Sequence, residues 1–170
     1  MHSKDKTQAL RQIFPDLENE DLTELAGVAE LRTYPPDTIL CREGKVEDTF
    51  YAIVSGQVEV TKQLDDETEK VINRPGPGSF VGEIALVQEC PRTATVRTVE
   101  PTTVLEIDRD DFVAMLHRSA SMAVRIMLEI TPRLRDIDLN TIAHLRQKNA
   151  ELQQAYEELQ NKYQKLQQRS

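Results

Sequence analysis

The pattern of apolar and polar positions divides the chain into three zones, and the first is helical. In residues 1–31, apolar side chains recur at intervals of three and four, as in NEDLTELAGVAEL. Leu22, Leu25, Ala26 and Ala29 would lie on one face of such a helix. This zone therefore predicts N-terminal helices that cover the core of the domain.

The second zone, from residue 34 to residue 109, has the pattern of β-strands separated by turns. Its short apolar runs are DTIL, TFYAIV, QVEVTK, KVIN, TATVRTV and TTVLEI, separated by clusters of Gly, Pro and Asp. Roughly eight strands at this spacing favour a sandwich or a barrel-like roll. We therefore predict an α+β fold with an eight-stranded antiparallel, jelly-roll-like β-roll at about residues 30–108, between N-terminal and C-terminal helices.

The third zone returns to helical spacing after Arg109. A first helix is predicted over DFVAMLHR, and a second begins near Ser119 or Ser121. Pro132 lies inside the second helical pattern, where its ring and missing N–H should kink the helix or mark a hinge.

A heptad pattern follows to the end of the chain. Leucines recur every seven residues, and three residues before each stands a second set with one asparagine; the leucines are Leu145, Leu152, Leu159 and Leu166, and the second set is Ile142, Asn149, Tyr156 and Tyr163. Leucine at each d position with a single asparagine at an a position is typical of a parallel two-stranded coiled coil. The alternative is an amphipathic helix packed on its own domain. We divide the chain into a domain of residues 1–137 and a dimerisation helix of residues 138–170.

Composition limits the classes of function. The chain has 170 residues, of which 39% are hydrophobic, which suits one core and some additional helix. Its net charge of −8 disfavours non-specific binding to nucleic acid or anionic lipid. The apolar runs are too short to cross a bilayer, and no leader precedes them, so we expect a cytoplasmic protein without a membrane segment. Because we find no Ser/His/Asp set, metal cluster or phosphate-binding Walker loop, we expect neither an enzyme nor a cofactor.

One stretch carries candidate chemistry, VGEIALVQECPRTATV at residues 81–96. It has a lone carboxylate, Glu83, after a glycine, and Arg92 at the edge of a Thr/Val strand. If both side chains point into one cavity, they describe a ligand with hydroxyls at one end and an anion at the other.

This stretch resembles the phosphate-binding cassette of the cyclic nucleotide-binding domain family. That pattern is Gly-Glu-x-Ala-Leu, a spacer, and Pro-Arg-(Ala/Thr/Ser)-Ala-x-Val, and the matching residues are Gly82, Glu83, Ala85, Leu86, Pro91, Arg92, Thr93, Ala94 and Val96. The resemblance extends over residues 6 to about 137. One departure lies at residues 44–48, where the family commonly has Gly-acidic-x-Gly-Asp and this chain has GKVED. We expect that loop not to take part in recognising the charges of the nucleotide.

The resemblance implies a β-roll that binds a cyclic nucleotide without catalysis. Arg92 would present two donors to the phosphate, and Glu83 would accept from the ribose hydroxyl. Gly82 allows close approach of the backbone, and the turn EIAL would direct N–H groups near Ala85 and Leu86 at the anion. The predicted ligand residues are Gly82, Glu83, Ile84, Ala85, Leu86, Arg92, Thr93, Ala94, Val71 and Arg133.

The base and the output of the protein stay open. The base would lie against Val71 or Ile72, and the helix between Arg133 and Thr141 would cover it. Thr93 favours cGMP only mildly and does not decide between the two nucleotides. The expected ligand is therefore cAMP or cGMP. We expect a homodimer that signals through its coiled coil to a further domain or a partner protein, without direct binding to DNA. The alternative function is a dimerising scaffold that has the fold but binds no nucleotide.

Overall fold

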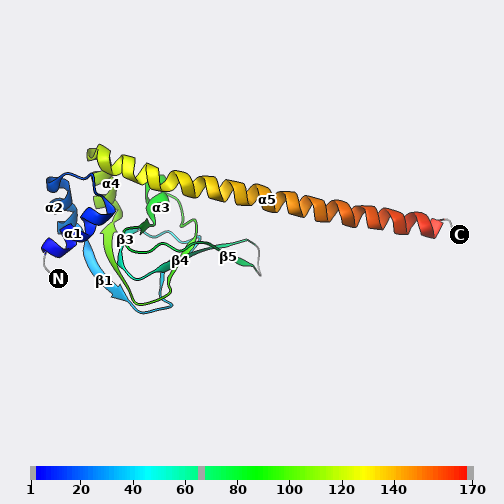
Figure 1. Cartoon of the computed structure of the whole chain (residues 1–170), viewed down its shortest axis with the longest axis horizontal. Helices are drawn as coiled ribbons and strands as arrows, with labels where there is room; N and C mark the ends of the chain where they lie inside the picture. The colour runs from blue at the N-terminus through cyan, green and yellow to red at the C-terminus, as the bar shows by residue number, and fades with distance from the viewer. Residues whose placement is uncertain (1–2, 65–67, 168–170) are drawn as a thin grey trace. The chain divides into compact units, whose positions relative to one another are not determined.

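The computed structural model describes residues 3–64 and 68–167. Within these ranges, the side chains of residues 3–4, 133–144, 159, 161, 163 and 165–167 are not described. In chain order the elements are α1 (Ser3–Ile13), α2 (Asn19–Val28), β1 (Glu30–Tyr34), β2 (Ile39–Cys41), β3 (Thr49–Ser55), β4 (Val58–Gln63), β5 (Glu69–Asn73), β6 (Phe80–Val81), α3 (Glu83–Gln88), β7 (Thr95–Thr98), β8 (Thr102–Asp108), α4 (Arg109–Arg118) and α5 (Ala120–Gln167) (Figure 1). The predicted α+β class is confirmed.

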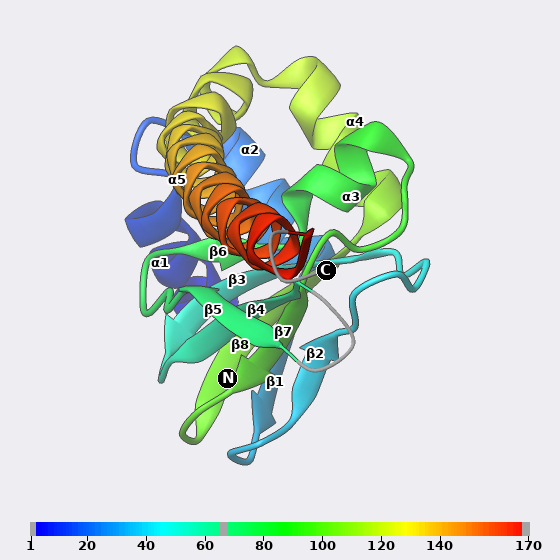
Figure 2. The same ribbon diagram turned by 90° about the vertical axis from the view of Figure 1, so that its right-hand side faces the viewer.

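The strands form two antiparallel sheets that enclose the core of the roll. One sheet has the order β1-β8-β3-β6, and the other has the order β2-β7-β4-β5 (Figure 2). Apolar side chains fill the space between them because each strand directs alternate residues inward. This core consists of Leu40, Cys41, Tyr51, Ile53, Val58, Val81, Val96 and Val104.

A cluster of four phenylalanines attaches the helices to the first sheet. The ring centroids of Phe50 and Phe112 are 4.4 Å apart, and those of Phe14 and Phe80 are 5.9 Å apart. These rings are fully buried and come from the end of α1, from β3, from β6 and from α4. Aromatic packing of this kind fixes β6 in place. It therefore also fixes the turn that follows β6, where the cassette begins.

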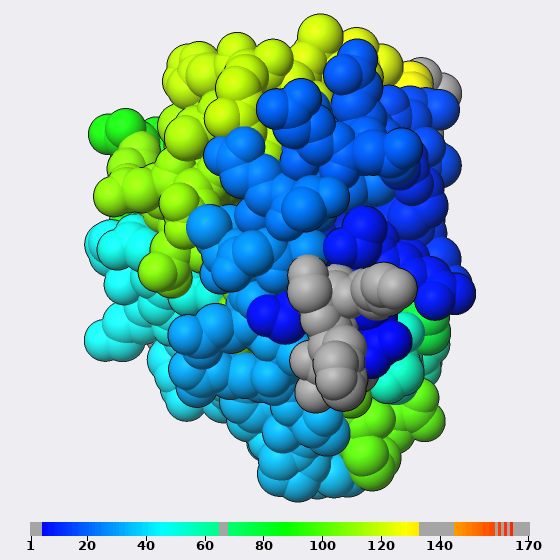
Figure 3. All heavy atoms as spheres, turned by 90° about the vertical axis from the view of Figure 1, so that its left-hand side faces the viewer, coloured from blue at the N-terminus to red at the C-terminus, as the bar shows by residue number. Residues whose placement is uncertain are grey.

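The N-terminal helices and α4 share one face of the molecule. Figure 3 shows α1 and α2 on this face, with residues of α4 beside them. Arg118 of α4 forms an ion pair with Glu24 of α2 at 2.6 Å. Arg125, near the start of α5, donates from Nε to the Ile13 carbonyl at 3.0 Å. The predicted helical cover over the roll is thus present, and it includes the first turns of α5.

Helix α5 passes through Pro132 without ending there. It runs as one helix from Ala120 to Gln167, so the proline does not divide it into two helices. The chain separates into two compact units, residues 1–127 and residues 128–170. No described helix is both long enough and apolar enough to cross a membrane.

The heptad zone is helical up to Gln167, as predicted. In the single chain the described seam side chains are exposed, with Leu145 at 57%, Leu152 at 68% and Tyr156 at 61%. Asn149 is exposed as well. The side chains of Ile142, Leu159, Tyr163 and Leu166 lie outside the described residues. The parallel dimer therefore stays a prediction.

Candidate functional site

The site begins at a glycine whose backbone and surroundings both exclude a side chain. Gly82 caps α3 with φ of +94°, in the left-handed region that favours glycine. A Cβ atom at this position would lie 2.7 Å from Nη1 of Arg92 and 3.0 Å from the Thr49 carbonyl oxygen. Gly82 therefore lets the Arg92 guanidinium reach the backbone directly in front of α3.

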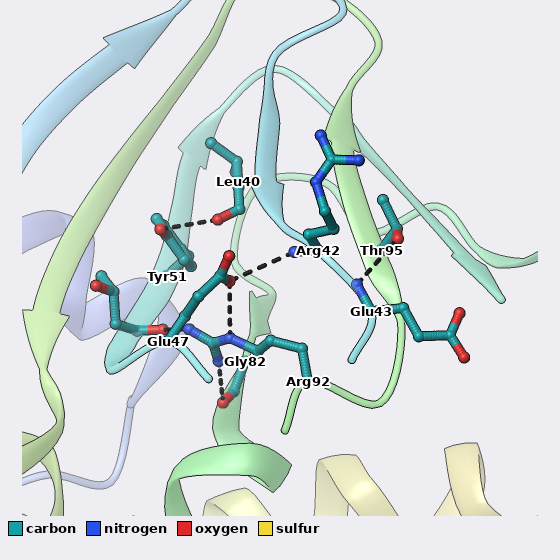
Figure 4. A network of polar contacts seen from close by, with 9 residues as sticks. Leu40, Arg42, Glu43, Glu47, Tyr51, Gly82, Arg92 and Thr95 are labelled. Carbon is teal, nitrogen blue, oxygen red and sulfur yellow. Dashed lines mark hydrogen bonds and ion pairs between the residues drawn. The ribbon is translucent and has the colours of Figure 1, made fainter. Parts of the chain in front are cut away.

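Arg92 is buried in the roll, with its side chain 2% exposed. Its guanidinium donates from Nη1 to the Gly82 carbonyl at 2.9 Å and from Nη2 to the Thr49 carbonyl at 2.5 Å. Its Nε donates to a carboxylate oxygen of Glu47 at 3.2 Å. Figure 4 shows the guanidinium between Gly82 and Glu47. A buried cation is stable only when it is paired in this way.

The 44–48 loop contacts Arg92 directly, which the sequence did not indicate. The Arg92 N–H donates to the Lys45 carbonyl at 2.8 Å, and the Gly44 N–H donates to the Arg92 carbonyl at 2.8 Å. Glu47 also accepts from the Arg42 N–H at 3.4 Å (Figure 4). We missed Glu47 from the sequence. The only signal was an acidic residue at the loop position where the family commonly has its second glycine.

Glu83, the first residue of α3, is also buried, with 2% of its surface exposed. Its charge and those of Arg92 and Glu47 all act on the thiol of Cys41. Burial raises the pKa of that thiol to about 12; Arg92 opposes the rise, whereas Glu47 and Glu83 add to it. Burial likewise raises the pKa of the Tyr51 hydroxyl, which donates to the Leu40 carbonyl. Arg92 and Glu83 are thus both buried near Cys41, and Arg92 contacts the carbonyl that directly precedes Glu83.

The remaining cassette residues lie close in sequence to Glu83 or Arg92 and differ in their burial. Ala85 and Leu86 are buried in α3, and Ile84 is half-buried. Thr93 is exposed and Ala94 is half-buried, on the segment that leads into β7. All of these lie near Arg92 in the sequence, so the short helix and the loop after it are sufficient to gather them.

Val71 of β5 pairs with Thr61 of β4, next to a register shift between Val60 and Thr61. Thr61 is buried, whereas Val71 is 42% exposed. The expected contact of Val71 with the base stays a prediction. The side chain of Arg133 lies outside the described residues, so the covering helix stays a prediction.

A cavity of about 450 Å³ lies between α3, the 44–48 loop and the start of α4. It is lined by Val46, Glu47, Asp48, Ala85, Glu89, Cys90, Asp108, Arg109 and Asp110. Arg109 crosses it to donate from Nε to the Leu86 carbonyl at 3.3 Å, and it also pairs with the Glu89 carboxylate. Neither Arg92 nor Glu83 lines this cavity. The contacts of Arg109 with Leu86 and Glu89 tie the end of α3 to α4.

Comparison with known families decides the classification. The sequence profile described as "Cyclic nucleotide-binding domain" matches residues 31–119. The chain belongs to the cyclic nucleotide-binding domain family. This match covers the two sheets apart from Glu30, and it includes the cassette and α4.

Relatives of this cyclic nucleotide-binding domain include kinases and a bacterial receptor. The chain is 33% identical over 140 residues to the cGMP-dependent protein kinase, isozyme 2 forms cD5/T2, of Drosophila melanogaster, covering 76% of this chain and 15% of that protein. It is 28% identical over 127 residues to the Cyclic AMP receptor protein of Thermus thermophilus, covering 75% of this chain and 59% of that protein. The chain thus spans less than two thirds of the length of these relatives.

Solved structures agree with this fold. The regulatory domain of Toxoplasma gondii PKA, crystallised with cAMP, superposes with a TM-score of 0.61 at 32% identity, covering 66% of this chain and 44% of that chain. The Thermus thermophilus Catabolite Activator Protein superposes with a TM-score of 0.68 at 26% identity, covering 78% of this chain and 62% of that chain. The resemblance to this family that the cassette indicated is therefore confirmed.

Proposed function

We propose that this domain is a cytoplasmic regulatory module that binds cAMP or cGMP in its β-roll. The observation that carries the proposal is the burial of Arg92 against the Gly82 carbonyl, directly before the buried Glu83. Arg92 would bind the cyclic phosphate, and Glu83 would accept a hydrogen bond from the ribose 2′-hydroxyl. The two side chains would thus hold opposite ends of one ligand.

The donors of Arg92 suit a monoanion. A guanidinium has five N–H donors, and protein acceptors use three of them here. One N–H group is left on each terminal nitrogen, so this pair can meet phosphate oxygens end-on, and the protein environment excludes most of the water that would weaken such bonds. The first turn of α3, with Ala85 and Leu86, would add backbone N–H groups on the same side.

Both nucleotides stay candidates. Thr93 is exposed beside Arg92, where its hydroxyl can meet either a phosphate oxygen or the amino group of a guanine. The first role suits cAMP and cGMP equally, and the second suits cGMP alone. Direct comparison of the two affinities separates these roles.

The output would pass through α5. We propose that the heptad leucines pair two copies of the chain in a parallel coiled coil, which relays nucleotide binding to a further domain or a partner protein. The nucleotide can shift the protein only by as much as its affinity differs between two conformations. The role is therefore regulatory rather than catalytic.

Isothermal titration of the full chain with cAMP and cGMP tests the proposal. We expect saturable binding of at least one nucleotide, and a loss of about 100-fold or more for Arg92→Ala, because a charge-assisted fork of two hydrogen bonds is removed. Arg92→Lys keeps the charge without the fork, so its nucleotide affinity should lie between those of the wild type and Arg92→Ala. Arg32→Ala, which removes a half-exposed arginine from β1, is the matched control and should bind as the wild type does.

The absence of heat with either nucleotide at high micromolar concentration would contradict the proposal. The dimerising scaffold would then be the better account. Circular dichroism spectra of all variants check that a lost signal reflects binding and not unfolding.

A further inference from the structure

We propose that Glu47 is an internal competitor of the ligand phosphate for Arg92. Its carboxylate holds the guanidinium in the ligand-free protein and moves aside when the nucleotide binds. Glu47 would thereby weaken nucleotide affinity and set the concentration at which the domain responds. This inference rests on the proposed function of Arg92.

The geometry places Glu47 on a donor that a phosphate would use. All three nitrogens of the Arg92 guanidinium already have an acceptor, namely the Gly82 carbonyl, the Thr49 carbonyl and the Glu47 carboxylate. A side-on fork to two phosphate oxygens needs Nε together with a neighbouring terminal nitrogen. Glu47 occupies Nε at 3.2 Å, so the phosphate has only the end-on pair of terminal donors while Glu47 stays, and it gains the side-on pair when Glu47 leaves.

Of these three acceptors, Glu47 is the one that can leave. The two carbonyls belong to the backbone around the cassette and β3, and they move only with it. The Glu47 side chain is 33% exposed, whereas that of Arg92 is 2% exposed. The other contact of the Glu47 carboxylate, with the Arg42 N–H, is long at 3.4 Å. A change of the Glu47 rotamer therefore frees Nε without disturbing the fold.

Formal charges favour the same conclusion. Arg92 carries +1, and Glu47 and Glu83 carry −1 each, so the three groups together carry −1 before a ligand arrives. A cyclic nucleotide adds a further −1 from its phosphodiester. Like charges at this range repel each other, and the repulsion is stronger where water is largely excluded. Removal of the Glu47 charge leaves the three positions neutral and should favour the anion.

Titration of Glu47→Gln in the full chain tests this inference, with cAMP and cGMP as the probes. Glutamine preserves the length of the side chain and its ability to accept from Nε, but it removes the charge. We expect about three- to tenfold tighter binding, the range set by loss of a partly exposed ion pair. The matched control is Glu43→Gln, because the Glu43 carboxylate accepts from the Gln63 N–H at 2.9 Å, a contact in which Arg92 takes no part.

Thermal unfolding gives a second readout. Without ligand, Glu47→Gln should lower Tm because Arg92 loses its counter-ion, whereas saturating nucleotide should raise Tm by more than it does in the wild type. A residue that only supports the loop would lower Tm without this larger ligand response.

The outcomes separate the inference from the proposed function. Unchanged or weaker binding by Glu47→Gln, with normal binding by the wild type, would overturn the competition and leave the nucleotide site intact. An equal gain in Glu43→Gln would also overturn it, because the effect would then be one of overall charge. If neither the wild type nor Glu47→Gln binds, the proposed function fails, and this inference fails with it.

Discussion

Replacement of Gly82 by alanine tests the central geometry of the site. The left-handed φ of +94° costs a non-glycine residue about 1–2 kcal/mol. The added Cβ would lie 2.7 Å from Nη1 of Arg92, so the guanidinium must move away. That movement breaks the 2.9 Å bond to the Gly82 carbonyl, a hydrogen bond from a charged group worth about 1.5–3 kcal/mol.

A smaller effect on the unfolded chain opposes these two losses of stability. Alanine restricts the unfolded chain more than glycine does, which stabilises the fold by about 0.4–1 kcal/mol. The net expectation for Gly82→Ala is therefore a loss of about 2–4 kcal/mol in the free energy of unfolding. Nucleotide affinity should fall as well, because Arg92 no longer lies where the phosphate would bind.

Substitutions at two other glycines separate the cost of the left-handed backbone from the cost of a steric clash with the added Cβ atom. Gly44 has a φ of +78° and nothing within 4 Å of an added Cβ, so Gly44→Ala should lose only about 1 kcal/mol or less. Gly27 lies in α2 with an ordinary φ and open space, so Gly27→Ala should stabilise the protein by about 0.5–1 kcal/mol.

The assay is urea unfolding of the full chain, followed by hydrogen exchange of peptides from β3. These peptides report on the roll rather than on the long helix α5. If Gly82→Ala loses no more stability than Gly44→Ala, Arg92 does not lie against Gly82, and the site as described is wrong.

Three further predictions concern the core, the coil and the far end of α3. Burial raises the pKa of the Cys41 thiol from its ordinary value of 9.0 to about 12, so the folded protein keeps a proton that the unfolded chain loses above pH 9.0. The free energy of unfolding should therefore fall from pH 9 to 10.5, by up to about 1.4 kcal/mol per pH unit, and Cys41→Ala should reduce this slope. Leu152→Lys should convert a dimer into a monomer in sedimentation velocity, whereas Gln154→Lys, on the outer side of the heptad, should not. Arg109→Ala should speed hydrogen exchange in α3 and weaken nucleotide binding by about two- to fivefold, whereas Arg32→Ala should do neither.

Each of these has a contradicting result. An unchanged alkaline slope in Cys41→Ala would show that this thiol is not the group that loses its proton on unfolding. An unchanged mass in Leu152→Lys would exclude the leucine seam as the dimer interface. Equal hydrogen exchange of α3 in the wild type and Arg109→Ala would show that Arg109 does not hold the helix.

The sequence was sufficient where local pattern determines structure. The two-residue period of the strands and the breaks at glycine and proline predicted the eight strands of the roll. The order of residues around Gly82 and Arg92 predicted the family, and the helical turn predicted over EIAL is the start of α3. These features depend on neighbours in the chain, which a single sequence displays directly.

The sequence was insufficient where contacts join distant segments. Glu47 meets Arg92 across 45 positions, and nothing local indicates that pairing. The register shift between β4 and β5, which sets the pairing of Val71 with Thr61, was likewise not predicted. Helix α5 runs through Pro132, and the predicted kink or hinge at that residue stays a prediction.

The contacts at the two ends of α3 suggest how binding would reach α5. At its start, Gly82 and Arg92 join the helix to the ligand site, and at its end Arg109 joins the Leu86 carbonyl to α4. Helix α4 holds α2 through Arg118, and the first turns of α5 hold the end of α1. Contiguity alone does not establish coupling; a shift in population between two arrangements does. Arg109 is outside the ligand site but bonds to α3, so Arg109→Ala distinguishes mere contiguity from coupling. If the nucleotide still binds this variant but no longer alters hydrogen exchange in α4, the contact between Arg109 and α3 is the route.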